Sequence, residues 1–364
     1  MPTPLLWTPL LAFAASVILH ALALKLFPRW GLLDFPERYG YARPRIPYPT
    51  GIVSVALFLA FFLCLERWNA QTGSVAAAVI LLATFSFIDD RTPLPPLLRA
   101  GVQAVAGLVI FWGGAQVYSF TNPFEHLAGG AVIPLDRWRL TVPLLGNIPV
   151  WSAVFTVFWI GLTTNALNWF DGIPGQVPVL ATIGFLTIGF LSLSARVDQP
   201  SLALIAFVLA GIGGGCLLFG LPGNRMVIGD TGAMFFGLML GVLTIYSGGK
   251  VATAFLVLGV PLVDFALVIG RRILKGKSIL KGDMRDEHLH HRLLRKGWNR
   301  GAIIALTAGL GTLFGISALF FSTQEKIIAA AVLFLVMLGL SVYSRPREGS
   351  GKGLVEETGT PPQP

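Results

Sequence analysis

Apolar residues in this chain come in long blocks that short polar stretches separate. Eleven blocks approach the ~20 residues that a helix needs to cross the hydrocarbon core of a bilayer, and two of them, 50–66 and 74–88, are shorter. The predicted spans are 5–27, 50–66, 74–88, 100–118, 150–168, 177–194, 201–219, 230–247, 251–270, 301–322 and 326–343. The pattern therefore predicts an all-α integral membrane protein with about 11 transmembrane helices, in a single domain over residues 1–343.

Composition excludes the other broad classes of protein. The 364 residues are 54% hydrophobic and only 12% charged, with a mean hydropathy of +0.72. A soluble domain carries about 25% charged residues, so this chain has too few to coat a water-facing surface. The glycines and prolines follow no G-X-Y repeat, which excludes collagen. Cys64 and Cys216 lie inside apolar blocks and are predicted to be small core residues, not a disulfide or a metal pair.

Lysine and arginine predict the orientation in the membrane. The loops after the odd-numbered blocks, together with the C-terminal tail, carry 21 of the 27 basic residues. Basic residues favour cytoplasmic loops, so the N-terminus is predicted outside and the C-terminus in the cytoplasm. The same bias accounts for the net charge of +9. The sequence has no basic stripe interleaved with exposed aromatic residues, so nucleic acid is not a predicted partner.

The segments outside the blocks give three further predictions. The first basic residue, Lys25, lies at the far end of the first block, which is the reverse of a secretory signal, so no cleavage is expected. Residues 344–364 lack hydrophobic periodicity and predict a disordered cytoplasmic tail. Within 119–149, alternation over Gly130–Leu135 and Leu140–Leu145 predicts a small outer β-hairpin. The sequence shows no internal repeat, which weakens the alternative of an ion-coupled transporter.

Five aspartates sit at the ends of the apolar blocks or inside one. Asp89 and Asp90 end the third block, Asp171 follows the fifth, Asp230 opens the eighth, and Asp264 lies within the ninth. A carboxylate at membrane depth costs a few kcal/mol, so it normally faces a cavity, a partner or a metal ion. All five fall on the predicted cytoplasmic side, which predicts a shared site. The alternative is that each caps a helix end or pairs with a nearby arginine.

Two of the acidic motifs suit a metal ion and a diphosphate. Adjacent carboxylates such as Asp89 and Asp90 repel each other unless a cation lies between them. Mg²⁺ prefers a few carboxylate oxygens together with substrate phosphates. Asn165, Asn168 and Asp171 step by three and stay near one helix face, where amides can bind a base, a sugar or metal-bound water. An ordinary polar helix end is the alternative in both cases.

The other two motifs are a helix start and a histidine cluster. Asp230 and Thr231 suit an N-cap, and equally a phosphate site at a helix N-terminus. His288, His290 and His291 lie in a segment rich in Arg and Lys, without a nearby cysteine. A diphosphate is therefore a better predicted ligand than zinc, and contact with anionic lipid headgroups is the alternative.

Together these motifs resemble one family. The blocks F-I-D-D-R-T-P-L-P, N-A-L-N-W-F-D-G-I-P-G, G-D-T-G-A-M-F-F-G, P-L-V-D-F and D-E-H-L-H-H-R-L-L follow each other over about residues 28–300. They are similar to the polyprenyl-phosphate N-acetylhexosamine-1-phosphate transferases, glycosyltransferase family 4, which include the phospho-N-acetylmuramoyl-pentapeptide transferase of peptidoglycan synthesis. The resemblance implies transfer of a sugar-1-phosphate from a UDP-N-acetylhexosamine, first of all UDP-N-acetylglucosamine, to undecaprenyl phosphate, with release of UMP.

The resemblance also implies the cofactor, the location and the residue roles. It implies Mg²⁺, with Mn²⁺ as an alternative, in a multi-pass protein of the bacterial plasma membrane with a cytoplasmic active site, and it leaves a homodimer open. Asp89 and Asp90 match the family's paired catalytic acids, and Asp230 and Asp171 match its metal ligands. The residues that match its substrate-binding positions are Asn165, Asn168, Asp171, Asp264, His288, His290, His291 and Arg292.

Finer features point to a branch of the family. The H-x-H-H spacing resembles the branch that uses UDP-N-acetylhexosamines for O-antigen, teichoic acid or enterobacterial antigen, whereas the peptidoglycan branch typically has three consecutive histidines. Three positions depart from the family pattern: Gly51 stands alone where a Gly-Gly pair is usual, Pro174 replaces an Asp, and Ala233 replaces a Ser. These departures concern recognition of the sugar and the lipid more than the phosphoryl chemistry.

Overall fold

The protein is built almost entirely of helices. A computed structural model of the chain describes residues 3–35, 44–122, 132–143, 146–221, 225–248, 251–278 and 287–345. Among these residues, eight helices are long and apolar enough to cross a membrane. They are α1 (Thr3–Leu26), α3 (Ala70–Arg91), α6 (Val150–Phe170), α7 (Gln176–Leu193), α8 (Pro200–Gly220), α9 (Gly229–Tyr246), α13 (Arg300–Phe320) and α14 (Thr323–Tyr343). Two shorter apolar helices are α2 (Gly51–Leu65) and α4 (Pro96–Trp112). The prediction of a helical multi-pass membrane protein is confirmed, whereas the number of 11 spans and the orientation stay predictions.

One predicted span, 251–270, is two helices and not one. α10 (Val251–Val257) is followed by Leu258 alone, and α11 (Gly259–Leu274) begins directly after that residue. Pro261 has no backbone N–H to donate to the carbonyl of Val257, which interrupts the hydrogen-bond ladder at this point. The break makes α11, which carries Asp264, a helix separate from α10.

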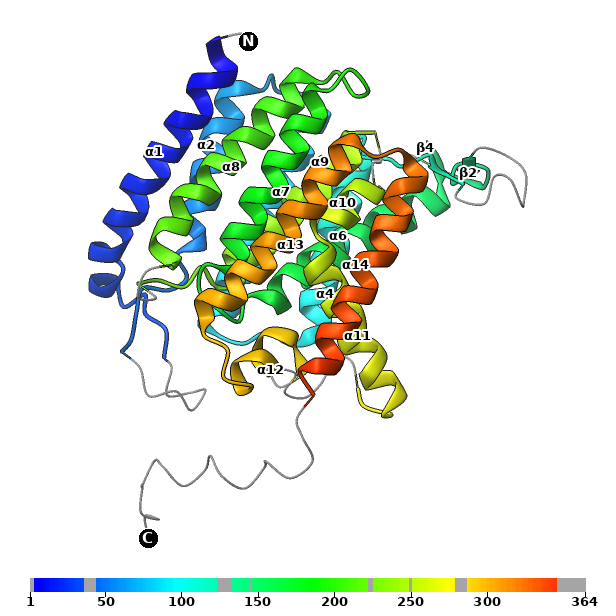
Figure 1. The fold of residues 1–364 in the computed structure, drawn as a ribbon. Helices are drawn as coiled ribbons and strands as arrows, with labels where there is room; N and C mark the ends of the chain where they lie inside the picture. Colours follow the sequence, from blue (N-terminus) through cyan, green and yellow to red (C-terminus); the bar gives the residue numbers. More distant parts are fainter. Residues whose placement is uncertain are drawn as a thin grey trace.

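The helix that opens with Asp230 lies at the centre of the bundle. In α9, 89% of the apolar window is buried inside the protein, compared with 22% for α1 and 28% for α14. α9 packs against α2, α3, α6 and α7, while α1, α8 and α7 line up along one flank of the molecule (Figure 1). The exposed apolar side chains of α1 and α14 suit contact with lipid. The start of α9 is therefore held by several neighbouring helices.

Two small hairpins replace the single hairpin that the sequence predicts. β1 (Ser119–Thr121) pairs antiparallel with β2 (Val132–Pro134), which places Phe120 opposite Ile133. β3 (Arg139–Val142) pairs antiparallel with β4 (Gly146–Pro149), which places Leu140 opposite Ile148. The first predicted piece therefore pairs with the strand before it, across residues 122–131, and the second pairs with the strand after it, across a short turn.

The two ends of the bundle carry different elements. The short helix α12 (Leu289–Arg295) and the end of α11 lie at one end, opposite the hairpins and the start of α1 (Figure 1). A 3₁₀ turn, η1 (Pro28–Trp30), follows α1. Cys216 is buried as predicted, but Cys64 is exposed on α2, so its prediction as a core residue was wrong. The predicted disordered tail lies outside the described residues from 346 onward.

Candidate active site

Asp90 joins the end of α3 to the start of α9. Its Oδ1 accepts hydrogen bonds from the Tyr48 hydroxyl at 2.5 Å and the Asp230 N–H at 2.8 Å. Its Oδ2 accepts from the N–H and the hydroxyl of Thr231 at 3.0 and 2.5 Å. A side chain of α3 therefore caps the N-terminus of α9. This role usually belongs to the residue that directly precedes a helix. Gly229, at φ +72°, makes the turn in front of this cap, and a Cβ there would collide with the Asp90 carboxylate.

Arg99, in the first turn of α4, bridges two of the predicted site residues. Its Nε lies 3.1 Å from Asp89 Oδ2, and its Nη2 lies 2.9 Å from Asp230 Oδ2. The Asp89 side chain is only 6% exposed, whereas Arg99 and Asp230 are each 32% exposed. Asp89 also accepts a hydrogen bond from the N–H of Leu94 at 2.6 Å. The guanidinium thus provides positive charge between carboxylates from α3 and α9.

The end of α6 contributes Asn168 and Asp171 to the same place. The Asn168 Nδ2 donates to Asp230 Oδ2 at 3.3 Å, while its buried Oδ1 has no hydrogen-bond partner. Asp171 is the C-cap of α6, and its carboxylate makes no hydrogen bond or ion pair within the described part of the chain. Burial, and then the charges of Asp230 and Asp90, raise the pKa of Asp171 well above its ordinary value. We call Asp89, Asp90, Asp171 and Asp230 the carboxylate cluster.

Asn165 lies one turn before this cluster and has a partner of its own. Its Nδ2 donates to the Gln103 side-chain oxygen at 2.6 Å and to the Gly161 carbonyl at 2.7 Å. The Gln103 amide donates back to the Asn165 Oδ1 at 3.2 Å. This reciprocal pair ties α6 to α4, which carries Arg99. Asn165 therefore helps to fix the position of α6 relative to α4, and these two helices carry Asn168 and Arg99.

Asp264 of α11 organises the histidine segment. Its Oδ2 lies 2.8 Å from the His288 Nδ1, and its Oδ1 accepts the N–H of Leu289 at 3.0 Å. Asp264 is buried and caps α12 from another helix, as Asp90 does for α9. The ring of His288 stands edge-on to Trp169, which follows Asn168 at the end of α6. The predicted residues Asp264 and His288 therefore meet, and His288 brings the start of α12 beside the end of α6.

His290 is buried next to the turn that follows Asp171. Neither of its ring nitrogens has a hydrogen-bond partner. Its ring meets Phe170 edge-on, and a Cβ at Gly172 would collide with its Nε2. Burial, and then the adjacent imidazoles of His291 and His288, lower the pKa of His290 well below its ordinary value. The imidazole is therefore neutral and offers one donor and one acceptor.

Arg292 contacts a different part of the molecule. Its Nη1 and Nη2 donate to the Oγ and carbonyl oxygen of Ser341, at 3.3 and 2.6 Å, near the end of α14. Arg271 donates to the same hydroxyl at 2.6 Å. These arginines fasten α11 and α12 to α14. The guanidinium of Arg292, unlike that of Arg99, makes no ion pair with the carboxylate cluster in the described chain.

Comparison with known proteins places the chain in a family. The sequence model of glycosyl transferase family 4 matches residues 72–248, which include the carboxylate cluster. A probable undecaprenyl-phosphate N-acetylglucosaminyl 1-phosphate transferase of Bacillus subtilis is 26% identical over 76% of this chain and 73% of its own length. The undecaprenyl-phosphate α-N-acetylglucosaminyl 1-phosphate transferase of Yersinia pestis is 27% identical over 94% of this chain and 91% of its own length. The decaprenyl-phosphate N-acetylglucosaminephosphotransferase of Mycolicibacterium smegmatis is 28% identical, with 88% and 84% covered.

The chain belongs to glycosyl transferase family 4. The family resemblance stated from the motifs is therefore confirmed. These relatives are phosphoglycosyl transferases, each named for a polyprenyl phosphate and an N-acetylglucosamine group. The histidine segment lies beyond the part that the family 4 sequence model matches, but the Yersinia relative aligns over nearly the whole chain.

Within this family 4 protein, the structure unites most of the predicted site residues. Four aspartates, Asn168 and the histidine segment gather around the end of α6 and the start of α9. Sequence reasoning missed Arg99, Tyr48 and Gln103, which contact Asp89, Asp90 or Asn165. Only Arg99 carried a signal, as a lone basic residue beside a predicted span, and its partner Asp230 lies 131 positions away.

Proposed function

We propose that the protein transfers N-acetylglucosamine-1-phosphate from UDP-N-acetylglucosamine to undecaprenyl phosphate and releases UMP. Two relatives, from Bacillus and Yersinia, are named for this acceptor and this transferred group. The observation that carries the proposal is the meeting of carboxylates, the Arg99 guanidinium and the Asn168 amide at the start of α9. A transporter pathway would instead place acidic groups at several depths of the bundle.

Mg²⁺ is the cofactor that we propose for this reaction. No group of three or more His, Cys, Asp and Glu side chains in the described ranges is preassembled to hold a metal ion. Mg²⁺ usually keeps several waters and takes one or two carboxylates plus substrate phosphates, so a protein cage is not required. Asp171 and Asp230 fit this need, and the buried Asn168 Oδ1 has no partner. When bound, the ion would offset the negative charge of the reacting phosphates.

The lipid phosphate is the proposed nucleophile. A phosphate monoester has a second pKa near 6, so it is largely ionised without a strong base. One of its oxygens forms a bond to the sugar-linked phosphorus of the donor, and the bond from that phosphorus to the UMP oxygen breaks. Asp90 accepts four hydrogen bonds, and Asp89 is occupied by Arg99 and the Leu94 N–H. These contacts favour direct attack over a covalent aspartyl intermediate.

Arg99, Asp90 and the histidines supply positioning and charge. Asp90 fixes the start of α9 and so aims Asp230. Arg99 would stabilise charge that develops on the phosphates. His288, His290 and His291 would bind the donor's diphosphate or sugar, since the neutral His290 has both ring nitrogens unpartnered. The basic loops on this end of the bundle support a cytoplasmic active site, where UDP-sugars are made.

Release of UMP from purified protein tests the proposal. The assay contains UDP-N-acetylglucosamine, undecaprenyl phosphate and Mg²⁺, and UMP and the lipid product are both quantified. We expect equal amounts of the two products and none without the lipid. Asp230→Asn should be inactive, and Asp136→Asn, in the exposed loop before β3, is the matched control. Turnover only with UDP-N-acetylmuramoyl-pentapeptide would contradict the donor, and no UMP with either donor would contradict the reaction.

A further inference from the structure

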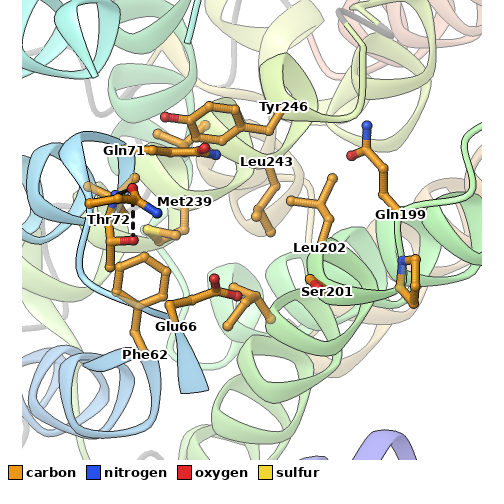
Figure 2. Close-up of a pocket in the computed structure, with 15 residues that line it drawn as sticks. Phe62, Glu66, Gln71, Thr72, Gln199, Ser201, Leu202, Met239, Leu243 and Tyr246 are labelled. Carbon is orange, nitrogen blue, oxygen red and sulfur yellow. Dashed lines mark hydrogen bonds between the residues drawn. The ribbon is translucent and has the colours of Figure 1, made fainter. Parts of the chain in front are cut away.

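A cavity lies at the opposite end of the bundle from the carboxylate cluster. It has a volume of about 500 Å³ and lies between the end of α2, the starts of α3 and α8, and the end of α9 (Figure 2). α9 starts beside Asp230 and ends at Tyr246, so at 1.5 Å per residue about 25 Å separate the two places. The volume is in the range of small-molecule sites, and the cavity shares no residue with the candidate active site.

The floor of this cavity is apolar. It is formed by Phe62 of α2, Leu202 and Ile205 of α8, and Met239 and Leu243 of α9. Phe62, Ile205, Met239 and Leu243 are buried in the protein core. These side chains offer an alkyl group a surface that is removed from water, which favours its binding in proportion to the area covered.

The rim of the cavity carries polar side chains that the protein does not use. Glu66, Gln71, Gln199, Ser201 and Tyr246 make no side-chain hydrogen bond or ion pair within the described chain. The Tyr246 hydroxyl is buried without a partner. Tyr246, Gln71 and Glu66 lie along one side of the view in Figure 2, and Gln199 and Ser201 lie along the other. Unused polar groups around an apolar floor are the usual composition of a ligand site.

The charge of the lining selects among ligands. Glu66 is the one charged side chain among the residues that line the cavity, and no Lys, Arg or His joins it there. An anion such as a nucleotide or a lipid phosphate would meet an uncompensated carboxylate. An ammonium group would meet its opposite charge, together with amide and hydroxyl oxygens that accept its three N–H bonds.

We propose that this cavity binds an amphiphile with a primary ammonium head. Glu66, Gln71, Gln199 and Tyr246 receive the head, and the alkyl part lies on the floor formed by Phe62 and its neighbours. The site is independent of the transferase reaction proposed above, because it stands on a different cavity and different residues.

Protection of a reporter cysteine tests this site without reference to catalysis. Ser201 is exposed at the rim, so Ser201→Cys gives a thiol at the cavity in a background where Cys64, the exposed native cysteine, is Ser. The full chain is labelled with N-ethylmaleimide in the presence of n-octylamine, n-octanol or n-octanoate. The three probes share an alkyl chain and differ in head charge. We expect octylamine to protect at about fivefold lower concentration than octanol, and octanoate to protect least.

Variants decide whether Glu66 and the cavity cause the protection. Glu66→Gln should remove the advantage of octylamine over octanol. Asp198→Asn is the matched control, because Asp198 is an exposed carboxylate just before α8 that does not line the cavity. Its φ of +48° suits Asn. Leu243→Trp should fill the floor and abolish protection by all three probes.

Three results would overturn the proposal. Equal protection by the three probes would mean that alkyl chains alone enter. An octylamine advantage that persists in Glu66→Gln would place the ammonium elsewhere, and absence of protection would remove the site. Gel filtration and thermal melting verify the fold of each variant. If Ser201→Cys does not fold, Pro200→Cys serves as the reporter, because Pro200 is exposed, lines the same cavity and is not among the residues proposed to receive the head.

Discussion

The double contact of Arg99 makes a quantitative prediction about the proposed cofactor. The guanidinium lies 2.9 Å from Asp230 and 3.1 Å from Asp89, so it already neutralises part of the charge that Mg²⁺ would meet. A divalent ion held by Asp230 would stand about 5 Å from this positive charge. At that distance, a single and a double charge repel by about 1.7 kcal/mol even with the dielectric constant of water. Arg99 is a third exposed, so the water-like value is the appropriate one.

Arg99→Gln should therefore lower the Mg²⁺ concentration that gives half-maximal activity, and it should also slow the reaction. Since 1.36 kcal/mol is a factor of ten, a repulsion of about 1.7 kcal/mol predicts half-maximal activity at about 15- to 20-fold lower Mg²⁺. Maximal turnover should fall about 100-fold, because a charge that stabilises the transferring phosphate is lost. Asp89 keeps its hydrogen bond from Leu94, so unfolding should become easier by only about 1–3 kcal/mol.

The assay is UMP release over a Mg²⁺ titration, with thermal melting measured on the same samples. Arg139→Gln is the matched control, because Arg139 pairs with Asp136 at 3.2 Å on the exposed hairpin, away from the site. Half-maximal activity at the same or a higher Mg²⁺ concentration in Arg99→Gln would refute the electrostatic reasoning. A lower melting temperature with normal turnover would show that Arg99 only fastens α4 to α3.

Four further substitutions test the remaining assignments. Asp230→Asn should lower turnover about 100-fold or more and leave the melting temperature nearly unchanged, because the helix keeps its cap from Asp90; normal turnover at low Mg²⁺ would contradict the metal role. Asp90→Asn turns an amide toward donors that now reach a carboxylate, so the free energy of unfolding should fall by about 1–3 kcal/mol in denaturant titrations; unchanged stability would contradict the capping role. His290→Ala should raise KM for the UDP-sugar about tenfold with little change for the lipid phosphate, and a loss of stoichiometric zinc in this variant would instead indicate a metal site. Gly172→Ala should mimic His290→Ala in kinetics, since the added methyl displaces the imidazole, and unaltered kinetics would separate the two residues.

The sequence predicted the spans and the meeting of the aspartates for simple physical reasons. Apolar length is what a bilayer requires, and the side of the membrane follows from counting the spans, so Asp90 and Asp230 fall at one end without any knowledge of packing. The predicted residues Asp264 and His288 also meet, although no feature of the sequence indicates their direct contact. The helix break before Pro261 had a signal in the proline itself, which the apolar pattern hid.

Pairings across the bundle could not be predicted in the same way. Asp89 with Arg99 and Asn165 with Gln103 depend on how α4 is rotated against its neighbours, and α4 carries no motif that fixes that rotation. Arg292 looked like a phosphate-binding residue because it lies among histidines, but the last turn of α14 contacts its guanidinium. Side-chain chemistry alone does not say which of two nearby acceptors a long flexible cation reaches.

The two caps supplied from neighbouring helices give the site one rigid wall and one adaptable wall. Asp90 ties three segments together through four hydrogen bonds at the start of the most deeply buried helix, so those amides should exchange with deuterium only when the whole bundle opens. α12 has only seven residues, and it is held by the contacts of Asp264 with His288 and Leu289 and by those of Arg292 with Ser341. A change of sugar donor could therefore evolve by remodelling α12 alone, while the wall that carries Asp230 stays as it is.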